Sequence, residues 1–186
     1  MEDIALARRV VDLLDERAIA TAESCTAGRV AEVLAAVEGA SGFLRGGLVA
    51  YQDEVKRDLL GLTAESVFTR QAAEEMARGA ARLFTAAVTV ATTGVAGDSP
   101  TEGTAPGTVY IATYVDGDVD AREHRFEGDP EEVCDQARRA ALTDLVRVLE
   151  GSPPSAERQV DAVLEAGGQV VGEDDGTLLV EGPNTR

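Results

Sequence analysis

Four side chains in the first third of the chain could support acyl-transfer chemistry: Ser24, Cys25, Tyr51 and Lys56. A serine hydroxyl is a weak nucleophile and needs a neighbouring base to accept its proton. The only histidine, His124, lies in a polar, alternating stretch, so we expect it at the surface and not in a catalytic triad. A desolvated lysine can act as the base instead, and a tyrosine hydroxyl can relay the proton. The residue types therefore allow a Ser-Lys hydrolase.

Each of these residues also has a structural interpretation. Ser24 or Thr26 could simply cap the helix that follows, because serine and threonine are favoured N-cap residues. Cys25 could be a small buried residue, and Tyr51 could pack at the end of a strand. Lys56 is the most informative, since it is the sole lysine beside 16 arginines in this chain. Lysine, unlike arginine, can lose its proton and act as a base.

The composition limits the classes of partner and site. The formal net charge is −17, which disfavours nucleic acid and acidic membranes as partners. An acidic, lysine-poor surface also resembles that of proteins from extreme halophiles. No apolar run is long enough to span a membrane, no signal peptide is recognisable, and two cysteines make no disulfide framework, so we expect a cytoplasmic protein. No metal-ligand spacing, P-loop or GxGxxG motif occurs, and we expect neither a metal nor an organic cofactor.

Hydrophobic periodicity predicts the elements that would hold these residues. Helices are expected at about 3–17, from Ser24 or Thr26 to Val37, at 55–62, 69–84 and 129–149, and strands at 18–22, 46–51, 86–94, 107–115 and 119–126. Helices alternate with strands, and Asp116-Gly117 indicates one late hairpin. This pattern predicts an α/β fold, a three-layer α/β/α sandwich with a mixed, mostly parallel five-stranded sheet. Ligands of such sheets bind beyond the carboxyl ends of the strands, where Ser24, Tyr51, Lys56 and the segment 92–97 would converge.

The chain is expected to comprise a main domain, residues 1–150, and an appendage, residues 151–186. The appendage begins with the linker GSPPS (151–155), continues with a short helix at about 156–166 and ends in a β-hairpin over 169–180 turned by Asp175-Gly176. It is too small to have much of a core of its own, and we expect it to pack on the main domain or on a second subunit.

Several motifs in register carry a resemblance to a known family. The segments AESCTAG (22–28), GGLVAYQDEVKRDLLGL (46–62), VTVATTGVAG (88–97), PGTVYIA (106–112) and FEGDPEEVCDQARRAAL (126–142) resemble the CinA C-terminal domain family over about residues 3–150. Members of that family include nicotinamide mononucleotide deamidases, which release ammonia and nicotinate mononucleotide and serve pyridine-nucleotide recycling. The resemblance implies an amidohydrolase with a three-layer α/β/α fold, a pyridine nucleotide as substrate and no cofactor.

The resemblance also implies a role for individual residues. Ser24 would be the nucleophile, with Lys56 and Tyr51 handling the proton. The residues expected to contact substrate are Glu23, Cys25, Thr26, Gly28, Thr93, Gly94, Gly97, Gly107 and Thr108.

This chain departs from the family pattern at several positions. Ala27 replaces the first glycine of a GG pair, Asp53 stands where asparagine is usual, and Cys134 stands where arginine is frequent. GDSP (97–100) replaces GPGG, and residues 104–106 replace Lys-Pro-Val. Two basic residues that the resemblance would place near a phosphate are therefore missing.

Three readings remain open on the sequence. The chain could deamidate nicotinamide mononucleotide, it could be a hydrolase of the same mechanism acting on another amide, or it could be a non-catalytic nucleotide-binding module. A homodimer is expected in each case.

Overall fold

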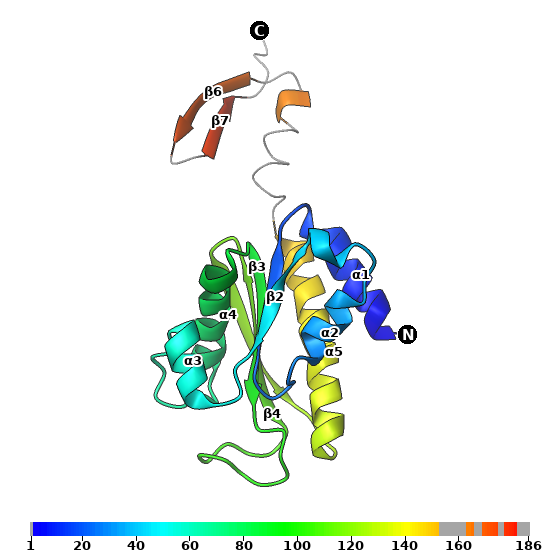
Figure 1. The fold of residues 1–186 in the computed structure, drawn as a ribbon, viewed down its shortest axis with the longest axis vertical. Helices are drawn as coiled ribbons and strands as arrows, with labels where there is room; N and C mark the ends of the chain where they lie inside the picture. The colour runs from blue at the N-terminus through cyan, green and yellow to red at the C-terminus, as the bar shows by residue number, and fades with distance from the viewer. Residues whose placement is uncertain (1, 153–162, 166–168, 175–176, 182–186) are drawn as a thin grey trace. The chain divides into compact units, whose positions relative to one another are not determined.

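The computed structural model describes residues 2–152, 163–165, 169–174 and 177–181. The chain divides into two compact units, Met1–Ser152 and Pro153–Arg186. The first unit contains a five-stranded sheet and its helices, and Figure 1 shows it as the larger ribbon.

The sheet has the strand order β2-β1-β3-β4-β5. Its strands are β1 (Ile19–Glu23), β2 (Leu44–Val49), β3 (Val88–Gly94), β4 (Thr108–Val115) and β5 (Asp118–Arg125). Strand β1 pairs in parallel with β2 and with β3, whereas the β3–β4 and β4–β5 pairs are antiparallel.

The expected mixed, five-stranded sheet is confirmed, but only two of its four strand pairs are parallel, because β4 runs opposite to the other four strands. A parallel neighbour requires a crossover connection, usually a helix. No helix lies between β3 and β4, which are joined by the loop Val95–Gly107, so the chain reverses direction there. The hairpin predicted at Asp116-Gly117 does join β4 to β5.

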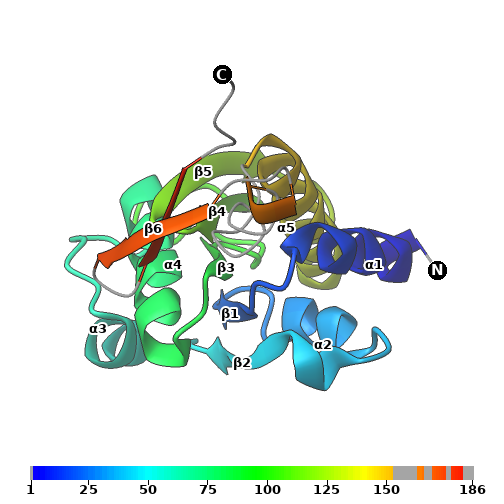
Figure 2. The ribbon, with the colours of Figure 1, turned by 90° about the horizontal axis from the view of Figure 1, so that it is seen from above.

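Helices cover both faces of this sheet (Figures 1 and 2). On one face α1 (Glu2–Leu14), α2 (Arg29–Ala35) and α5 (Pro130–Gly151) pack on a core that includes Ile19 and Val90. On the other face, α4 (Arg70–Phe84) packs on a second core that is rich in alanine. The helix α3 (Asp53–Leu60) lies against α4, and a Cβ at Gly79 would stand 2.2 Å from the Leu60 carbonyl oxygen.

Local sequence explains most helix ends. The Thr69 side chain caps α4 by accepting from the Ala72 N–H, and Asp129 with Glu132 forms a capping box at the start of α5. Gly61 ends α3 in a left-handed conformation. These caps agree with the predicted ends of the three helices.

The start of α2 was predicted wrongly. Neither Ser24 nor Thr26 caps this helix, which begins at Arg29 after Gly28 as its N-cap residue. Ala27 (φ 52°) and Gly28 (φ 95°) both have left-handed backbone conformations and form a turn between β1 and the helix. The residues Ser24–Gly28 therefore form a loop at the end of β1.

The second unit contains one antiparallel hairpin of β6 (Gln169–Asp174) and β7 (Thr177–Glu181). This agrees with the predicted hairpin, whose turn residues 175–176 lie outside the described residues. The predicted linker and short helix also lie largely outside them, although residues 163–165 are helical.

Candidate active site

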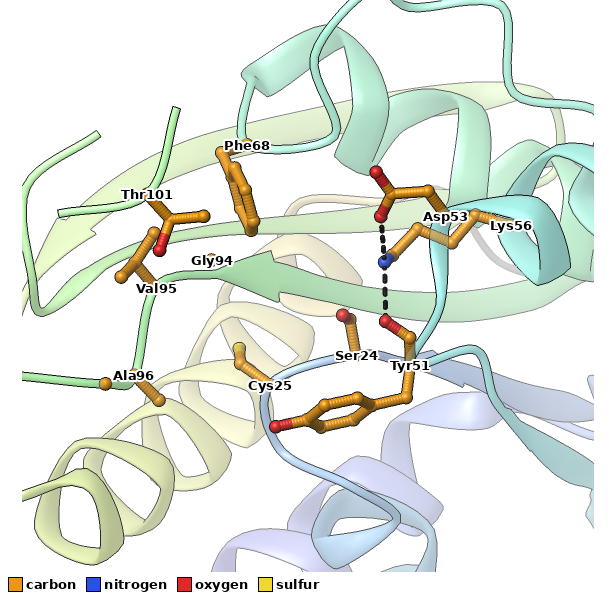
Figure 3. A pocket seen from close by; sticks show the side chains of 11 residues that line it. Ser24, Cys25, Tyr51, Asp53, Lys56, Phe68, Gly94, Val95, Ala96 and Thr101 are labelled. Atoms are coloured by element: carbon orange, nitrogen blue, oxygen red, sulfur yellow. Dashed lines mark hydrogen bonds and ion pairs between the residues drawn. The ribbon is translucent and has the colours of Figure 1, made fainter. Parts of the chain in front are cut away.

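A pocket of about 200 Å³ lies beyond the carboxyl ends of β1 and β3, beside the first turn of α3 (Figure 3). The parallel pairing of β2, β1 and β3 brings these strand ends to one edge of the sheet. The lining residues are Ser24, Cys25, Tyr51, Asp53, Lys56, Phe68, Gly94, Val95, Ala96, Gly97 and Thr101. Six of the predicted site residues are therefore brought together here: Ser24, Cys25, Tyr51, Lys56, Gly94 and Gly97.

Ser24 follows β1 directly, and its backbone is fixed by the neighbouring strand. Its N–H donates to the Thr92 carbonyl oxygen at 2.9 Å, which continues the pairing of β1 with β3 by one residue. The residue is 6% exposed, and in Figure 3 its hydroxyl points toward the space that Lys56 also faces. No hydrogen bond joins the Ser24 hydroxyl to the Lys56 amine directly.

Lys56 is almost completely buried, with 1% of the residue exposed. Its Nζ donates to the Tyr51 carbonyl oxygen at 3.1 Å and to Asp53 Oδ1 at 3.3 Å. Asp53 and Lys56 are three residues apart on α3, a spacing that puts them on the same face of a helix. Burial is the setting in which a lysine can work as a base, and the two partners fix the position of the amine.

Tyr51 contributes in a different way from the one expected. Its backbone carbonyl, not its phenol, contacts the Lys56 amine. The residue is 65% exposed, and in Figure 3 the phenol ring extends away from Lys56. The Tyr51 hydroxyl is therefore not hydrogen-bonded to Lys56 in this structure, and its role in handling a proton stays a prediction.

Glu23 lies beneath the pocket as a buried carboxylate with 0% exposure. Its two carboxylate oxygens accept hydrogen bonds from the Thr21 and Thr26 hydroxyls and from the N–H groups of Gly28, Val30 and Ala31. Three of these donors lie at the start of α2, so the carboxylate replaces the missing side-chain cap and faces the positive end of the helix dipole. Glu23 therefore holds the loop that carries Ser24, and its carboxylate does not line the pocket.

Five further residues that were expected to contact substrate lie outside the lining: Thr26, Gly28, Thr93, Gly107 and Thr108. Thr26 bonds to Glu23 and to Thr92, and the Thr93 hydroxyl donates to the Val67 carbonyl oxygen at 2.7 Å. Arg125 donates to the Thr108 hydroxyl. The three threonine hydroxyls are thus engaged in hydrogen bonds within the fold.

Gly107 has a structural role outside the pocket lining. It has φ 75°, and a Cβ there would stand 2.0 Å from the Phe126 carbonyl oxygen. The glycine therefore allows the backbone of the chain to pass close to the end of β5, and this need explains the residue without a ligand.

Cys25 has the environment of an inert thiol. Burial raises the pKa of the Cys25 thiol to about 12, and the nearby Cys134 adds to the increase. The Cys134 sulfur donates to the Cys25 carbonyl oxygen at 2.9 Å. Because a thiolate and not a thiol is the reactive species, Ser24 is the better candidate nucleophile of the two neighbours.

Phe68 and Thr101 complete the pocket, and neither residue was singled out from the sequence. Phe68 comes from the segment between α3 and α4, and Thr101 from the loop after β3. The two loops are joined by a hydrogen bond from the Ser66 hydroxyl to Glu102 Oε2 at 2.8 Å. No local motif marks these residues, because their place in the site depends on the tertiary fold.

Glu75 anchors the first of these loops from α4. It accepts hydrogen bonds from Gln71, from the N–H groups of Thr63 and Ala64 and from the Thr63 hydroxyl. Burial alone would raise the pKa of Glu75, but these hydrogen bonds lower it to about 2.

The charges in the pocket are few. Among its lining residues only Asp53 and Lys56 carry charge, and they form an ion pair.

Over the described ranges, no group of three or more His, Cys, Asp or Glu side chains could hold a metal ion. In the same part of the chain, no helix is long and apolar enough to cross a membrane.

Comparisons with known proteins agree on one family. The model of the CinA C-terminal domain matches residues 3–149. A CinA-like protein of Mycolicibacterium gilvum is 39% identical over 150 residues, which cover 77% of this chain and 36% of that protein. The chain spans about a third of the length of the first curated relatives that it matches.

Shorter relatives are covered more fully. Protein YdeJ of Escherichia coli is 34% identical over 151 residues, covering 78% of this chain and 87% of that protein. The crystal structure of a CinA superfamily protein from Klebsiella pneumoniae matches with a TM-score of 0.78 and 34% identity, covering 82% of this chain and all of the other.

Proposed function

The chain belongs to the CinA C-terminal domain family, and from this premise we propose that it is an amidohydrolase that deamidates nicotinamide mononucleotide. The observation that carries the proposal is that Ser24 and Lys56 line one pocket, with the amine buried. A nucleophile next to a lysine in a site shielded from water is the arrangement that Ser-Lys hydrolases use. The products would be nicotinate mononucleotide and ammonia.

In the proposed reaction the Ser24 oxygen attacks the carboxamide carbon, and the Lys56 amine, acting as the base after it has given up its own proton, accepts the hydroxyl proton. The carbonyl π bond opens to an oxyanion, and its collapse breaks the C–N bond. Lys56 returns the proton to the leaving nitrogen, so that ammonia departs and an ester to Ser24 remains. Water then attacks the ester carbon while the same amine takes its proton, the C–O bond to Ser24 breaks, and Lys56 returns the proton to the Ser24 oxygen as the carboxylic acid leaves.

The donors for the oxyanion in this proposal differ from those at an ordinary helix start. The N–H groups of Gly28, Val30 and Ala31 already donate to Glu23. These three N–H groups are therefore not free to hold the oxyanion. In this proposal the oxyanion is held by backbone N–H groups of the loop that carries Ser24.

One observation favours a non-catalytic binding module as a second candidate. The Lys56 amine donates to Asp53 and to the Tyr51 carbonyl, and it makes no direct hydrogen bond to Ser24. A lysine held in this way could serve only to shape a pocket that binds its ligand without turnover.

The test is ammonia release from nicotinamide mononucleotide by the full chain, compared with Ser24→Ala and Lys56→Ala. The proposal expects turnover by the unsubstituted protein and a loss of at least about 1,000-fold in each variant, as for other nucleophile and base removals. Binding of the nucleotide without turnover would support the module. Turnover of other amides alone would leave the mechanism and replace the substrate.

A further inference from the structure

We propose that Ser66 and Glu102 are positioning residues of the pocket: their hydrogen bond closes the loop of residues 96–106 onto residues 61–69, and this closure sets how tightly the pocket holds its ligand. Only the choice of ligand in the test rests on the proposed function. The link between the two segments does not depend on which reaction the pocket performs.

One wall of the pocket is built from two segments that are distant in the sequence. Phe68 belongs to residues 61–69, between α3 and α4, and Thr101 belongs to residues 96–106, after β3. In Figure 3 both side chains stand on the side of the pocket away from Lys56. A displacement of residues 96–106 would therefore change this wall while the Lys56 amine stays in place on α3.

Residues 61–69 are the fixed side of this wall. The Arg57 guanidinium on α3 donates to the Ala64 carbonyl oxygen at 2.9 Å, and the Thr93 hydroxyl on β3 donates to the Val67 carbonyl oxygen at 2.7 Å. Val67 itself is 1% exposed and belongs to the core beneath α4. The segment that carries Phe68 is therefore attached both to a helix and to the central sheet.

Residues 96–106 are the less constrained side. The N–H groups of Thr101 and Thr104 each donate to the other residue's carbonyl oxygen, at 3.1 and 2.8 Å, which closes a tight turn. Within the turn Glu102 (φ 49°) and Gly103 (φ 78°) have left-handed backbone conformations. Because the turn is held by its own hydrogen bonds, Glu102 and the lining residue Thr101 move together.

The Ser66 hydroxyl joins the two sides. It donates to Glu102 Oε2 at 2.8 Å and accepts the Phe68 N–H at 3.2 Å, so one oxygen contacts both parts of the wall. In the described part of the chain, the bond to Glu102 is the only hydrogen bond or ion pair between residues 96–106 and a segment other than β4. The hydrogen bonding that holds this loop over the pocket is therefore one bond to a charged acceptor, which is stronger than a bond between neutral groups.

The test removes the bond at Glu102 and compares it with a matched change in the same loop. Glu102→Ala deletes the acceptor, whereas Glu102→Gln keeps an acceptor oxygen and removes only the charge. Asp98→Ala is the control, because Asp98 is an exposed carboxylate outside the lining that accepts a hydrogen bond from the adjacent Ser99. Each variant is made in the unsubstituted chain and in the Ser24→Ala protein, in which a bound amide is not consumed.

The first readout is the motion of the loop, measured by ¹⁵N relaxation without ligand. We expect backbone order parameters near 0.85 at residues 101–104 of the unsubstituted chain, and a fall to about 0.6 or less in Glu102→Ala. Glu102→Gln and Asp98→Ala should stay close to the unsubstituted chain, since both keep an acceptor for Ser66.

The second readout is the affinity for nicotinamide mononucleotide. Loss of one hydrogen bond lowers the fraction of molecules with a closed loop, so the dissociation constant of the Ser24→Ala protein should rise about three- to fivefold when Glu102→Ala is added. In the chain that retains Ser24, KM should rise by a similar factor with kcat within about twofold, because a wall contact acts on substrate and transition state alike. Glu102→Gln should restore most of the affinity, and Asp98→Ala should leave it unchanged.

The outcomes separate this inference from the proposed function. Low order parameters in the unsubstituted chain, or an equal fall in Asp98→Ala, overturn the inference, as does a loosened loop with unchanged nucleotide affinity. A fall in kcat with KM unchanged in Glu102→Ala also overturns it, because Glu102 would then act on the reaction itself. A chain that neither binds nor hydrolyses the nucleotide rejects the proposed function, and the order parameters then decide alone whether the bond closes the loop.

Discussion

Replacing Glu23 by glutamine should destabilise the first unit by about 3 kcal/mol, because the buried carboxylate accepts hydrogen bonds from three N–H groups at the start of α2. The substitution keeps the shape of the side chain and removes its charge. It also turns one of the two acceptor oxygens into an N–H donor. Since the side chain is 0% exposed, water cannot replace what is lost.

The magnitude follows from the five hydrogen bonds that the carboxylate accepts. The glutamine fits best with its amide nitrogen in place of Oε1, where the Thr21 hydroxyl can reverse its direction but the Ala31 N–H cannot. An unpaired buried N–H costs about 1–3 kcal/mol, and the three bonds to the other oxygen each weaken by about 1 kcal/mol when the acceptor becomes neutral. The burial cost of the carboxylate, which glutamine avoids, offsets part of this sum.

The assay is equilibrium unfolding in urea at fixed salt and neutral pH, with Glu38→Gln as the matched control. Glu38 is exposed and follows α2, so the control makes the same change of charge without disturbing the buried network. Ammonia release, measured on the folded variants, should also fall for Glu23→Gln because the Ser24 loop loses its support. If the unfolding free energies of the two variants agree within about 0.5 kcal/mol, the carboxylate does not organise the loop.

Four further outcomes test other features of the molecule. Ala27→Gly should raise the unfolding free energy by up to about 1 kcal/mol, because relief of the left-handed backbone exceeds the added freedom of the unfolded chain; a loss in urea unfolding would contradict this. The pKa of Glu75 is lowered in the folded state to about 2, so the stability advantage of the unsubstituted chain over Glu75→Gln should be full above about pH 5 and disappear toward pH 2, as followed by acid-dependent unfolding. Cys25→Ala should retain ammonia release within about threefold while Ser24→Ala loses it, since the thiol remains protonated at neutral pH; equal losses would reopen the choice of nucleophile. The melting temperature should fall when molar KCl is replaced by dilute buffer, as expected for a net charge of −17 whose self-repulsion salt screens.

Local sequence signals anticipated the elements better than their arrangement. Periodicity indicated all five helices of the first unit, and Thr69 and the Asp129-Pro130 pair marked two of their starts correctly. The direction of β4 was predicted wrongly. A strand parallel to β3 would require a crossover helix between the two strands, and the segment Val95–Gly107 contains no helix. That cue was present in the sequence, whereas the strand order itself depends on long-range packing.

The site shows the same division. The types of Ser24 and Lys56, with the expected convergence of strand ends, correctly brought both into one pocket. The support given by Glu23 could not be read from spacing, since its donors come from a turn with two left-handed residues that no cap rule describes. The Tyr51 phenol was expected to act together with Lys56, whereas the contact with Lys56 in the structure is made by the Tyr51 carbonyl, because a sequence does not show which way a side chain points.

Because the chain reverses after β3, the reactive residues of the pocket and part of its wall come from different kinds of segment. The reactive residues stand on strand ends and a helix that the central core holds in place, while the Val95–Gly107 loop supplies another part of the wall through Val95, Ala96, Gly97 and Thr101. Asp98, Ser99 and Pro100 in this loop are exposed. Substitutions in this exposed loop can therefore change the wall of the pocket, and with it the choice of ligand, with little effect on folding and without altering Ser24 or Lys56.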